Sequence, residues 1–156
     1  MKSSKKLSPT IIVIFGGTGD LTKRKLIPAF YNLYIDGWMP EKFAVIGLGR
    51  TKLNDEDYRE HLYEGLVEFS RKGKPDDAQW DQFNPSISYF ESNINDEAAY
   101  KGLAAKLDAL DKEWGIRADR LFYLSIAPQF IEAATVNINR YKLANIPASD
   151  RIVVEK

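Results

Sequence analysis

The sequence of 156 residues has no cysteine, one histidine and no long apolar run. The absence of cysteine excludes a disulfide framework and a thiolate metal site, and no group of Asp, Glu and His residues has the spacing of metal ligands. The apolar run at residues 11–15 is too short for the core of a signal peptide, and no stretch of the sequence could span a bilayer. We therefore expect a soluble, cytoplasmic protein with no bound metal and no membrane partner.

The charges balance, with 22 basic and 22 acidic residues, so no net field attracts the chain to nucleic acid. Apolar residues make up 44% of the sequence, which is ordinary for a globular protein. A chain of this length is large enough for one domain with a core of its own. We expect a flexible N-terminal tail at residues 1–9 and a single folded domain at residues 10–156.

Apolar runs and helical segments alternate along the chain at the spacing of βαβ units. The predicted strands cover residues 11–15, 43–48, 87–90, 121–126 and 152–154. The predicted helices cover residues 20–34, 54–73, 95–115 and 128–145. Most of the strands are dense in Ile, Val, Leu or Phe, which is typical of parallel strands covered on both faces. The sequence therefore predicts a doubly wound parallel sheet of the Rossmann type, in three αβα layers.

Two local features refine this prediction. Pro28 lies inside the first helical segment, where we expect a kink or a fresh start. Residues 74–85 are predicted to form a polar loop that holds Trp80. In a doubly wound sheet ligands bind at the carboxyl ends of the strands, and the residues expected on that rim are 16–20, 49–51, Asn93, 126–129 and Lys156.

A glycine turn joins the first apolar run to the first helical segment. The N–H groups at the start of such a helix are unpaired and favour an anion, usually a diphosphate. Gly16 permits the tight turn, and Gly17 or Gly19 lets the backbone approach a phosphate. The spacing is G-x-x-G-x-x-T rather than G-x-G-x-x-G, and glycines can also mark an ordinary strand-to-helix turn. A Walker loop fails because Thr22-Lys23-Arg24 replaces Gly-Lys-Ser/Thr, which argues against ATP or GTP hydrolysis.

The residues after the second strand predict which coenzyme is bound. An enzyme that prefers NAD usually has Asp or Glu there, which accepts from the ribose 2′-OH. This chain instead has Arg50 and Thr51, which suit a 2′-phosphate. We therefore predict NADP as the coenzyme, with the alternative that Arg50 is a solvated loop arginine. Asp20 is interpreted mainly as a capping or hinge residue, and His61 as a surface residue away from the rim.

Several motifs resemble the N-terminal coenzyme domain of the glucose-6-phosphate dehydrogenase family. Residues 15–29, FGGTGDLTKRKLIPA, match the family pattern G-x-x-G-D-L-A-x-[KR]-K-L-x-P, apart from Thr22 in place of the commoner Ala. The likeness continues at Gly47-Leu48-Gly49-Arg50, at residues 123–128 and at residues 153–156. The resemblance covers essentially the whole chain, and its first motif is specific because ordinary Rossmann domains do not share it.

The resemblance implies NADP-linked oxidation of glucose 6-phosphate to 6-phosphogluconolactone, the entry to the pentose phosphate pathway. It also implies the following coenzyme-binding residues: Gly16, Gly19, Asp20, Leu21, Arg50, Asn93, Ile94, Ala127, Pro128 and Lys156. We expect Gly17, Thr18 and Thr51, which lie in the same two loops, to bind the coenzyme as well. Asn93 and Ile94 would lie near the adenosine, and Ala127 and Pro128 near the nicotinamide. Lys25 and Lys156 would contact the sugar substrate. Asn93 stands where Asp is commoner in the family, which weakens that assignment.

Family members are about three times as long as this chain, by the same resemblance. The further part carries R-I-D-H-Y-L-G-K, whose histidine removes the proton of the sugar hydroxyl, so no catalytic residue is expected in these 156 residues. We expect the chain alone to bind NADP weakly and to leave glucose 6-phosphate unchanged. The family is oligomeric, and the state of this chain is left open. The alternatives are a free-standing NADP-binding or sensor module, and another NADP oxidoreductase that shares the domain.

Overall fold

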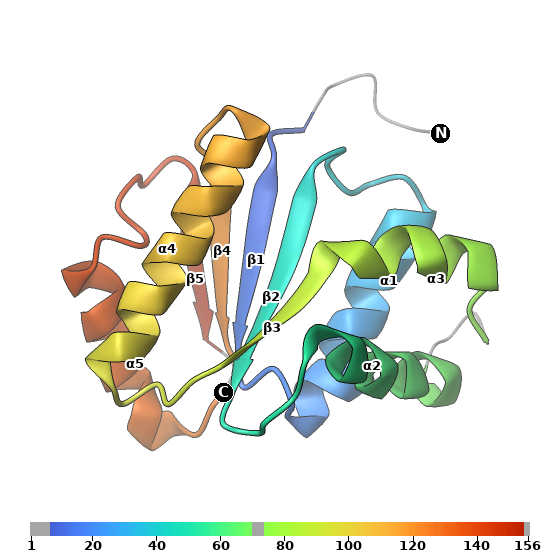
Figure 1. Cartoon of the computed structure of the whole chain (residues 1–156), viewed down its shortest axis with the longest axis horizontal. Helices are drawn as coiled ribbons and strands as arrows, with labels where there is room; N and C mark the ends of the chain where they lie inside the picture. Colours follow the sequence, from blue (N-terminus) through green and yellow to red (C-terminus); the bar gives the residue numbers. More distant parts are fainter. Residues whose placement is uncertain (1–6, 70–73, 155–156) are drawn as a thin grey trace.

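A five-stranded parallel sheet forms the centre of the protein. The computed structural model describes residues 7–69 and 74–154 (Figure 1). The strands are β1 (Thr10–Phe15), β2 (Phe43–Gly49), β3 (Ile87–Glu91), β4 (Asp119–Leu124) and β5 (Asp150–Val154). Their order in the sheet is β3-β2-β1-β4-β5, and every neighbouring pair is parallel. The chain therefore winds outward from β1 in one direction, returns to β4 and winds outward in the other, which confirms the doubly wound prediction.

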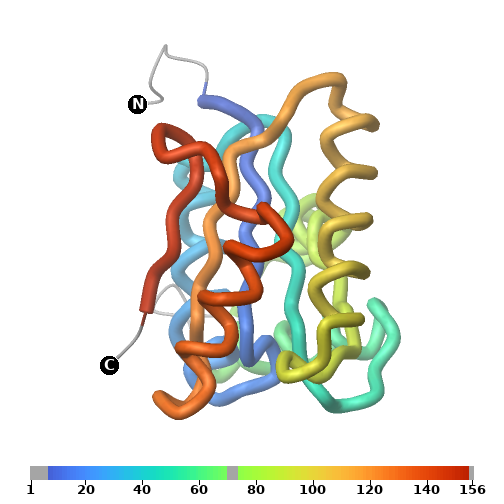
Figure 2. The backbone as a smooth tube through the Cα atoms, turned by 90° about the vertical axis from the view of Figure 1, so that its left-hand side faces the viewer, coloured from blue at the N-terminus to red at the C-terminus, as the bar shows by residue number. Residues whose placement is uncertain are grey.

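Helices cover both faces of this sheet (Figures 1 and 2). They are the π-helix η1 (Thr22–Leu26), α1 (Ile27–Ile35), α2 (Asp55–Phe69), α3 (Asp77–Phe83), the 3₁₀ turn η2 (Asn84–Ser86), α4 (Glu97–Trp114) and α5 (Pro128–Arg140). The helices α4 and α5 pack on one face, and α1, α2 and α3 pack on the other. Within the described parts of the chain, none of these helices is long and apolar enough to cross a membrane.

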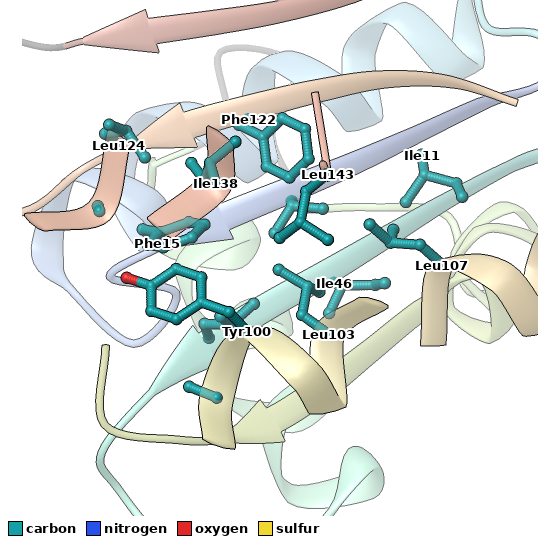
Figure 3. Packing of buried hydrophobic residues seen from close by; sticks show 14 of the residues in the cluster. Ile11, Phe15, Ile46, Tyr100, Leu103, Leu107, Phe122, Leu124, Ile138 and Leu143 are labelled. Atoms are coloured by element: carbon teal, nitrogen blue, oxygen red, sulfur yellow. The ribbon is translucent and has the colours of Figure 1, made fainter. Parts of the chain in front are cut away.

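Alternate side chains of each strand enter different halves of the core, because successive residues of a strand point to opposite faces. On β1, Ile11 and Phe15 face α4 and α5, whereas Ile12 and Ile14 face the other helical layer. Figure 3 shows the first of these clusters, with Tyr100 of α4 beside Phe15. Both layers of helices are needed to bury β1, which explains its unbroken apolar sequence.

The first helical segment changes its hydrogen-bond pattern at Pro28, as predicted. The N–H of Ile27 donates to the carbonyl of Thr22, five residues earlier, which defines the π-helix η1. Pro28 has no N–H, and its ring excludes the carbonyl that an α-helix would place four residues before it. The regular helix α1 therefore begins afresh at Ile27.

The predicted polar loop at residues 74–85 is wrong, because residues 77–83 form the helix α3. The carboxylate of Asp76 caps this helix and accepts from the N–H of Gln79 at 3.3 Å. Trp80 and Phe83, three residues apart, share the inner face and are buried. Two aromatic anchors thus fix a helix within a stretch of polar composition.

Other predicted boundaries agree with the structure to within a few residues. Gly115 ends α4 with a left-handed φ of 71°, as its position after the helix predicted. The last helix stops at Arg140, earlier than expected, and Lys142 then takes a φ of 55°. The expected end of α2 near Gly73, and residues 1–6 of the expected tail, lie outside the described residues.

Truncation of Phe83 tests the assignment of α3 to the core. Its ring is fully buried, with ring centroids 5.4 Å from Tyr31 and 5.2 Å from Tyr34. We expect Phe83→Ala to lower the free energy of unfolding by about 3–5 kcal/mol in urea denaturation. The control Trp38→Ala removes a ring that is 51% exposed, and we expect a change of about 0.5 kcal/mol or less. Equal losses for the two variants would contradict the assignment.

Candidate functional site

A cleft of about 310 Å³ lies at the carboxyl ends of the strands, where the chain leaves β1 and β4 toward helices on opposite faces of the sheet. It is lined by Gly16, Thr18, Gly19, Leu48, Gly49, Arg50, Thr51, Ser92, Asn93, Ile94, Asn95, Ile126, Ala127 and Phe130. These residues come from the segments that follow β1, β2, β3 and β4 and from the last residues of β2. The cleft thus occupies the switch point at which doubly wound sheets bind their ligands.

A larger hollow of about 510 Å³ lies between α2 and α3, away from the carboxyl ends of the strands. Its lining includes the carboxylates of Glu56, Glu60, Asp77 and Asp81, with Arg59 as its basic residue. The guanidinium of Arg59 donates to the carbonyls of Ile87 and Pro85. The surplus of negative charge would repel a phosphate, so the smaller cleft is the better candidate for a nucleotide.

Gly16 allows β1 to turn away from β4 at the start of the cleft. Its φ is 84°, and a Cβ at this position would overlap the carbonyl oxygen of Ser125. The carbonyl of Gly16 accepts from the N–H of Gly19 at 2.9 Å and from the hydroxyl of Thr22 at 3.0 Å. The turn is therefore closed by hydrogen bonds on its own carbonyl, and only glycine fits at its first position.

The helix that follows this turn presents unpaired N–H groups. The N–H of Lys23 donates to the carbonyl of Gly19 at 3.2 Å, which is the first rung of the helical ladder. The N–H groups of Asp20, Leu21 and Thr22 precede that rung and have no acceptor within the helix. Together with the helix dipole they favour an anion beside Gly19.

The segment after β2 brings a cation to the same cleft. Arg50 is exposed and, within the described residues, forms no ion pair. The nearest acidic residue along this loop is Asp55, whose carboxylate accepts from the N–H of Tyr89 at 2.8 Å. That carboxylate is therefore directed to β3, and the positive charge of Arg50 is left to face the cleft with Thr51.

The segments after β3 and β4 make the rest of the cleft less polar. Ile94, Ile126 and Phe130 contribute apolar side chains. The amide oxygen of Asn93 accepts from the N–H of Asn95 at 3.0 Å, which closes a tight turn after β3. A flat aromatic or heterocyclic group would fit this side, while charged groups of a ligand would lie toward Gly19 and Arg50.

A family model described as "Glucose-6-phosphate dehydrogenase, NAD binding domain" matches residues 13–156. The chain belongs to this family. The glucose-6-phosphate 1-dehydrogenase of Chlamydia muridarum is 34% identical, over 100% of this chain and 33% of that protein. The one of Leuconostoc mesenteroides is 32% identical, over 94% of this chain and 29% of that protein.

The fold comparison agrees with the sequence relatives. A solved structure of glucose-6-phosphate dehydrogenase in complex with its substrate glucose-6-phosphate has a TM-score of 0.80 and 28% identity to this chain. The superposition covers 97% of this chain and 31% of that one. The chain therefore spans about a third of the length of the glucose-6-phosphate dehydrogenases that it matches.

Most of the residues that sequence reasoning assigned to the coenzyme line the cleft. They are Gly16, Thr18, Gly19, Arg50, Thr51, Asn93, Ile94 and Ala127. Gly17 is buried behind the turn and its carbonyl accepts from the hydroxyl of Tyr58 at 2.8 Å. Leu21 and Pro128 flank the cleft without lining it, and Lys156 lies outside the described residues.

Two charged residues predicted at the site point to other environments. Asp20 is exposed, and its carboxylate pairs with Arg24 at 3.3 Å, one turn along the helix. Lys25 is exposed and is not among the residues that line the cleft. Within the described residues, no three His, Asp or Glu side chains are close enough together to hold a metal ion.

Sequence reasoning missed side chains that hold the loops from behind. The hydroxyls of Thr22, Tyr58, Tyr89 and Tyr100 each donate to a backbone carbonyl of a loop at the site. Thr22 could have been found, because it lies inside the glycine motif and replaces an alanine that has no hydroxyl. The tyrosines carry no such local signal, since tyrosine is also an ordinary residue of a core.

The interpretation of His61 as a surface residue away from the site needs correction. The ring is partly buried, and among the described residues its Nε2 is enclosed without a hydrogen-bond partner. Burial lowers the pKa of His61, and the nearby charge of Lys23 lowers it further. The charge of Glu64 and the backbone of Thr18 act in the opposite direction and raise it. Lys23 and Glu64 are themselves paired at 3.8 Å.

Exchange of glycine for alanine at two positions separates the cost of a left-handed φ from the cost of a steric clash of the Cβ. Gly16 and Gly115 both have left-handed φ values, of 84° and 71°, but a Cβ at Gly115 would meet nothing within 4 Å. We expect Gly115→Ala to lower the free energy of unfolding by about 1 kcal/mol, the ordinary cost of that conformation. Gly16→Ala should cost clearly more, because its Cβ also collides with Ser125. Equal losses in the free energy of unfolding for the two variants, measured by urea denaturation, would contradict this expectation and show that the backbone at the turn can move to avoid the clash.

The lowered pKa of His61 predicts how stability depends on pH. Below the ordinary histidine value of 6.5, the unfolded chain binds a proton more readily than the folded chain. The free energy of unfolding should therefore fall as the pH falls from 7.5 through 6.5 toward 5.5. His61 is the single histidine, so His61→Gln should flatten this dependence. Parallel pH profiles for the two proteins would contradict the assignment.

Proposed function

We propose that residues 10–156 are the coenzyme-binding domain of a glucose-6-phosphate dehydrogenase and that the cleft binds NADP. The whole protein would oxidise glucose 6-phosphate to 6-phosphogluconolactone in the cytoplasm, at the entry to the pentose phosphate pathway. The observation that carries this proposal is that the glycine turn, whose Gly19 accepts the first hydrogen bond of the helix that follows, and Arg50 line one cleft. Family membership supports the reaction.

The diphosphate of the coenzyme would lie at the start of the first helix. The N–H groups of Asp20, Leu21 and Thr22 and the glycine backbone would donate to its oxygens. The side chain of Asp20 lies 3.3 Å from Arg24, so the guanidinium offsets a carboxylate charge that would otherwise oppose the phosphate. Gly19 adds no side chain between backbone and ligand.

The choice of NADP over NAD would rest on Arg50. A guanidinium can donate two parallel hydrogen bonds to a phosphate, whereas NAD offers only a hydroxyl at that place. The carboxylate of Asp55 is directed to Tyr89, and no carboxylate is among the described residues that line the cleft, where it could accept from a ribose hydroxyl. Thr51 lines the cleft beside Arg50 and would add a further donor.

The two rings of the coenzyme would lie on opposite sides of the cleft. Asn93 and Ile94 would contact the adenosine, and Ala127 with Pro128 would lie near the nicotinamide. Bound NADP supplies the acceptor for the hydride that leaves the sugar. Lys25 and Lys156 would contact the sugar phosphate, and the base that removes the hydroxyl proton would come from the part of the family not spanned by this chain.

Replacement of Arg50 tests the coenzyme assignment. We expect Arg50→Ala to weaken NADP binding by roughly 10- to 100-fold, the worth of a charge-assisted hydrogen bond, and to leave NAD binding unchanged. Isothermal titration calorimetry is the suitable measurement, since Trp38, Trp80 and Trp114 do not line the cleft and need not report binding.

A matched control for this experiment is Arg151→Ala. Arg151 is an exposed arginine near the amino end of β5, where it donates to the carbonyl of Pro147. Both coenzymes should bind that variant as they bind the parent chain. If Arg50→Ala and Arg151→Ala bind NADP equally well, Arg50 is only a solvated loop arginine.

A further inference from the structure

Three loops of the cleft are each held from behind by one tyrosine hydroxyl. The hydroxyl of Tyr58 donates to the loop after β1, that of Tyr89 to the loop after β2, and that of Tyr100 to the loop after β3. In every case the acceptor is a backbone carbonyl and the distance is 2.8 Å or less. None of the three hydroxyls lines the cleft itself.

Tyr58 of α2 holds the glycine loop. Its buried hydroxyl donates to the carbonyl of Gly17 at 2.8 Å. The ring lies directly on the backbone of β2, because a Cβ at Gly47 would overlap the hydroxyl and the ring of Tyr58. The N–H of Thr18 belongs to the same trans peptide as that carbonyl and therefore points the opposite way. Since Thr18 lines the cleft, this hydroxyl sets the direction of a donor available to the diphosphate.

Tyr89 of β3 holds the loop that carries Arg50. Its hydroxyl donates to the carbonyl of Thr51 at 2.6 Å, and its N–H is bound by the carboxylate of Asp55. A Cβ at Gly49 would meet the hydroxyl at 2.8 Å, so the loop closes tightly over the ring. Tyr89 thus binds Thr51 on one side of Arg50 and lies close to Gly49 on the other, while Arg50 itself stays exposed.

Tyr100 of α4 holds the turn after β3. Its hydroxyl donates to the carbonyl of Ile94 at 2.6 Å, and its ring packs beside Phe15 at the end of the core (Figure 3). The turn that it holds is closed on the other side by Asn93. Each of these three loops is therefore tied to an element of the core by one tyrosine hydroxyl.

The three hydroxyls are protonated at neutral pH and can therefore donate. Burial raises the pKa of Tyr58 far above its ordinary value and raises the pKa of Tyr100 to about 12. Burial also raises the pKa of Tyr89, against the opposing effect of its hydrogen bond to Thr51. The ring centroids of Tyr58 and Tyr89 lie 4.8 Å apart, so the two tyrosines that hold the loops after β1 and β2 pack against each other.

We propose that Tyr58, Tyr89 and Tyr100 are positioning residues for the coenzyme, and that the hydroxyl of Tyr89 sets the preference for NADP over NAD. This inference rests on the proposed function. Tyr58 and Tyr100 position loops that would contact parts common to both coenzymes. Tyr89 positions the loop of Arg50, which would contact the one phosphate that distinguishes NADP.

The test compares Tyr→Phe variants, which keep the ring and remove one donor. Calorimetric titration of the chain with NADP and with NAD should show about five-fold weaker NADP binding for Tyr89→Phe, with NAD binding within two-fold of the parent. Tyr58→Phe and Tyr100→Phe should weaken both coenzymes by a similar factor and leave their ratio unchanged. The control Tyr34→Phe removes a hydroxyl 3.5 Å from Gln82, beside the first residue of β2 at the other end of the sheet, and should change neither affinity.

A general loss of stability cannot produce this pattern, because it would affect both coenzymes alike. Hydrogen exchange followed by mass spectrometry gives a second measurement that needs no ligand. Exchange should rise in residues 49–54 for Tyr89→Phe, and in residues 16–22 for Tyr58→Phe.

Suppose that the parent chain prefers NADP and that Tyr89→Phe has the same ratio of NADP affinity to NAD affinity as the parent. That result would overturn this inference and leave the proposed function standing. Unchanged exchange in both loops would also overturn it. A parent chain that binds neither coenzyme would overturn the proposed function, and the inference with it.

Discussion

The close approach of two backbones at the switch point is the constraint on which the cleft depends. Gly16 touches the carbonyl of Ser125 at the place where β1 and β4 begin to diverge. A side chain there would push the two strands apart, and the glycine turn could no longer close on its own carbonyl. Because the turn is closed, the helix after it begins with free N–H groups beside the cleft.

The second requirement is electrostatic and local. The chain as a whole has a formal net charge of zero, so it offers no long-range attraction to a phosphate. We propose that the attraction instead arises from a helix start and one exposed guanidinium at the same cleft, while acidic side chains gather in the hollow between α2 and α3. A protein with no net charge could therefore bind a highly charged coenzyme if a few backbone N–H groups and one guanidinium lie at the same cleft.

The sequence predicted the features that arise from neighbouring residues. The unbroken apolar runs of β1 and β2 identified parallel strands, and the glycine turn followed by Arg50 identified two sides of the cleft. The helix α3 was missed because its two aromatic anchors stand among polar residues. The hydrogen bonds from Tyr58 and Tyr89 to the loops were missed for another reason. Tyr58 and its acceptor are 41 positions apart in the sequence, Tyr89 and its acceptor are 38 positions apart, and no local pattern reveals such pairs.

The most direct test of the account follows the backbone amide signals of the isotope-labelled chain while NADP is added. The account predicts that the signals of Thr18, Gly19, Leu21, Arg50 and Thr51 shift together with one binding curve, and that those around the acidic hollow stay in place. Saturable shifts centred on the hollow between α2 and α3, with the glycine turn unaffected, would contradict it.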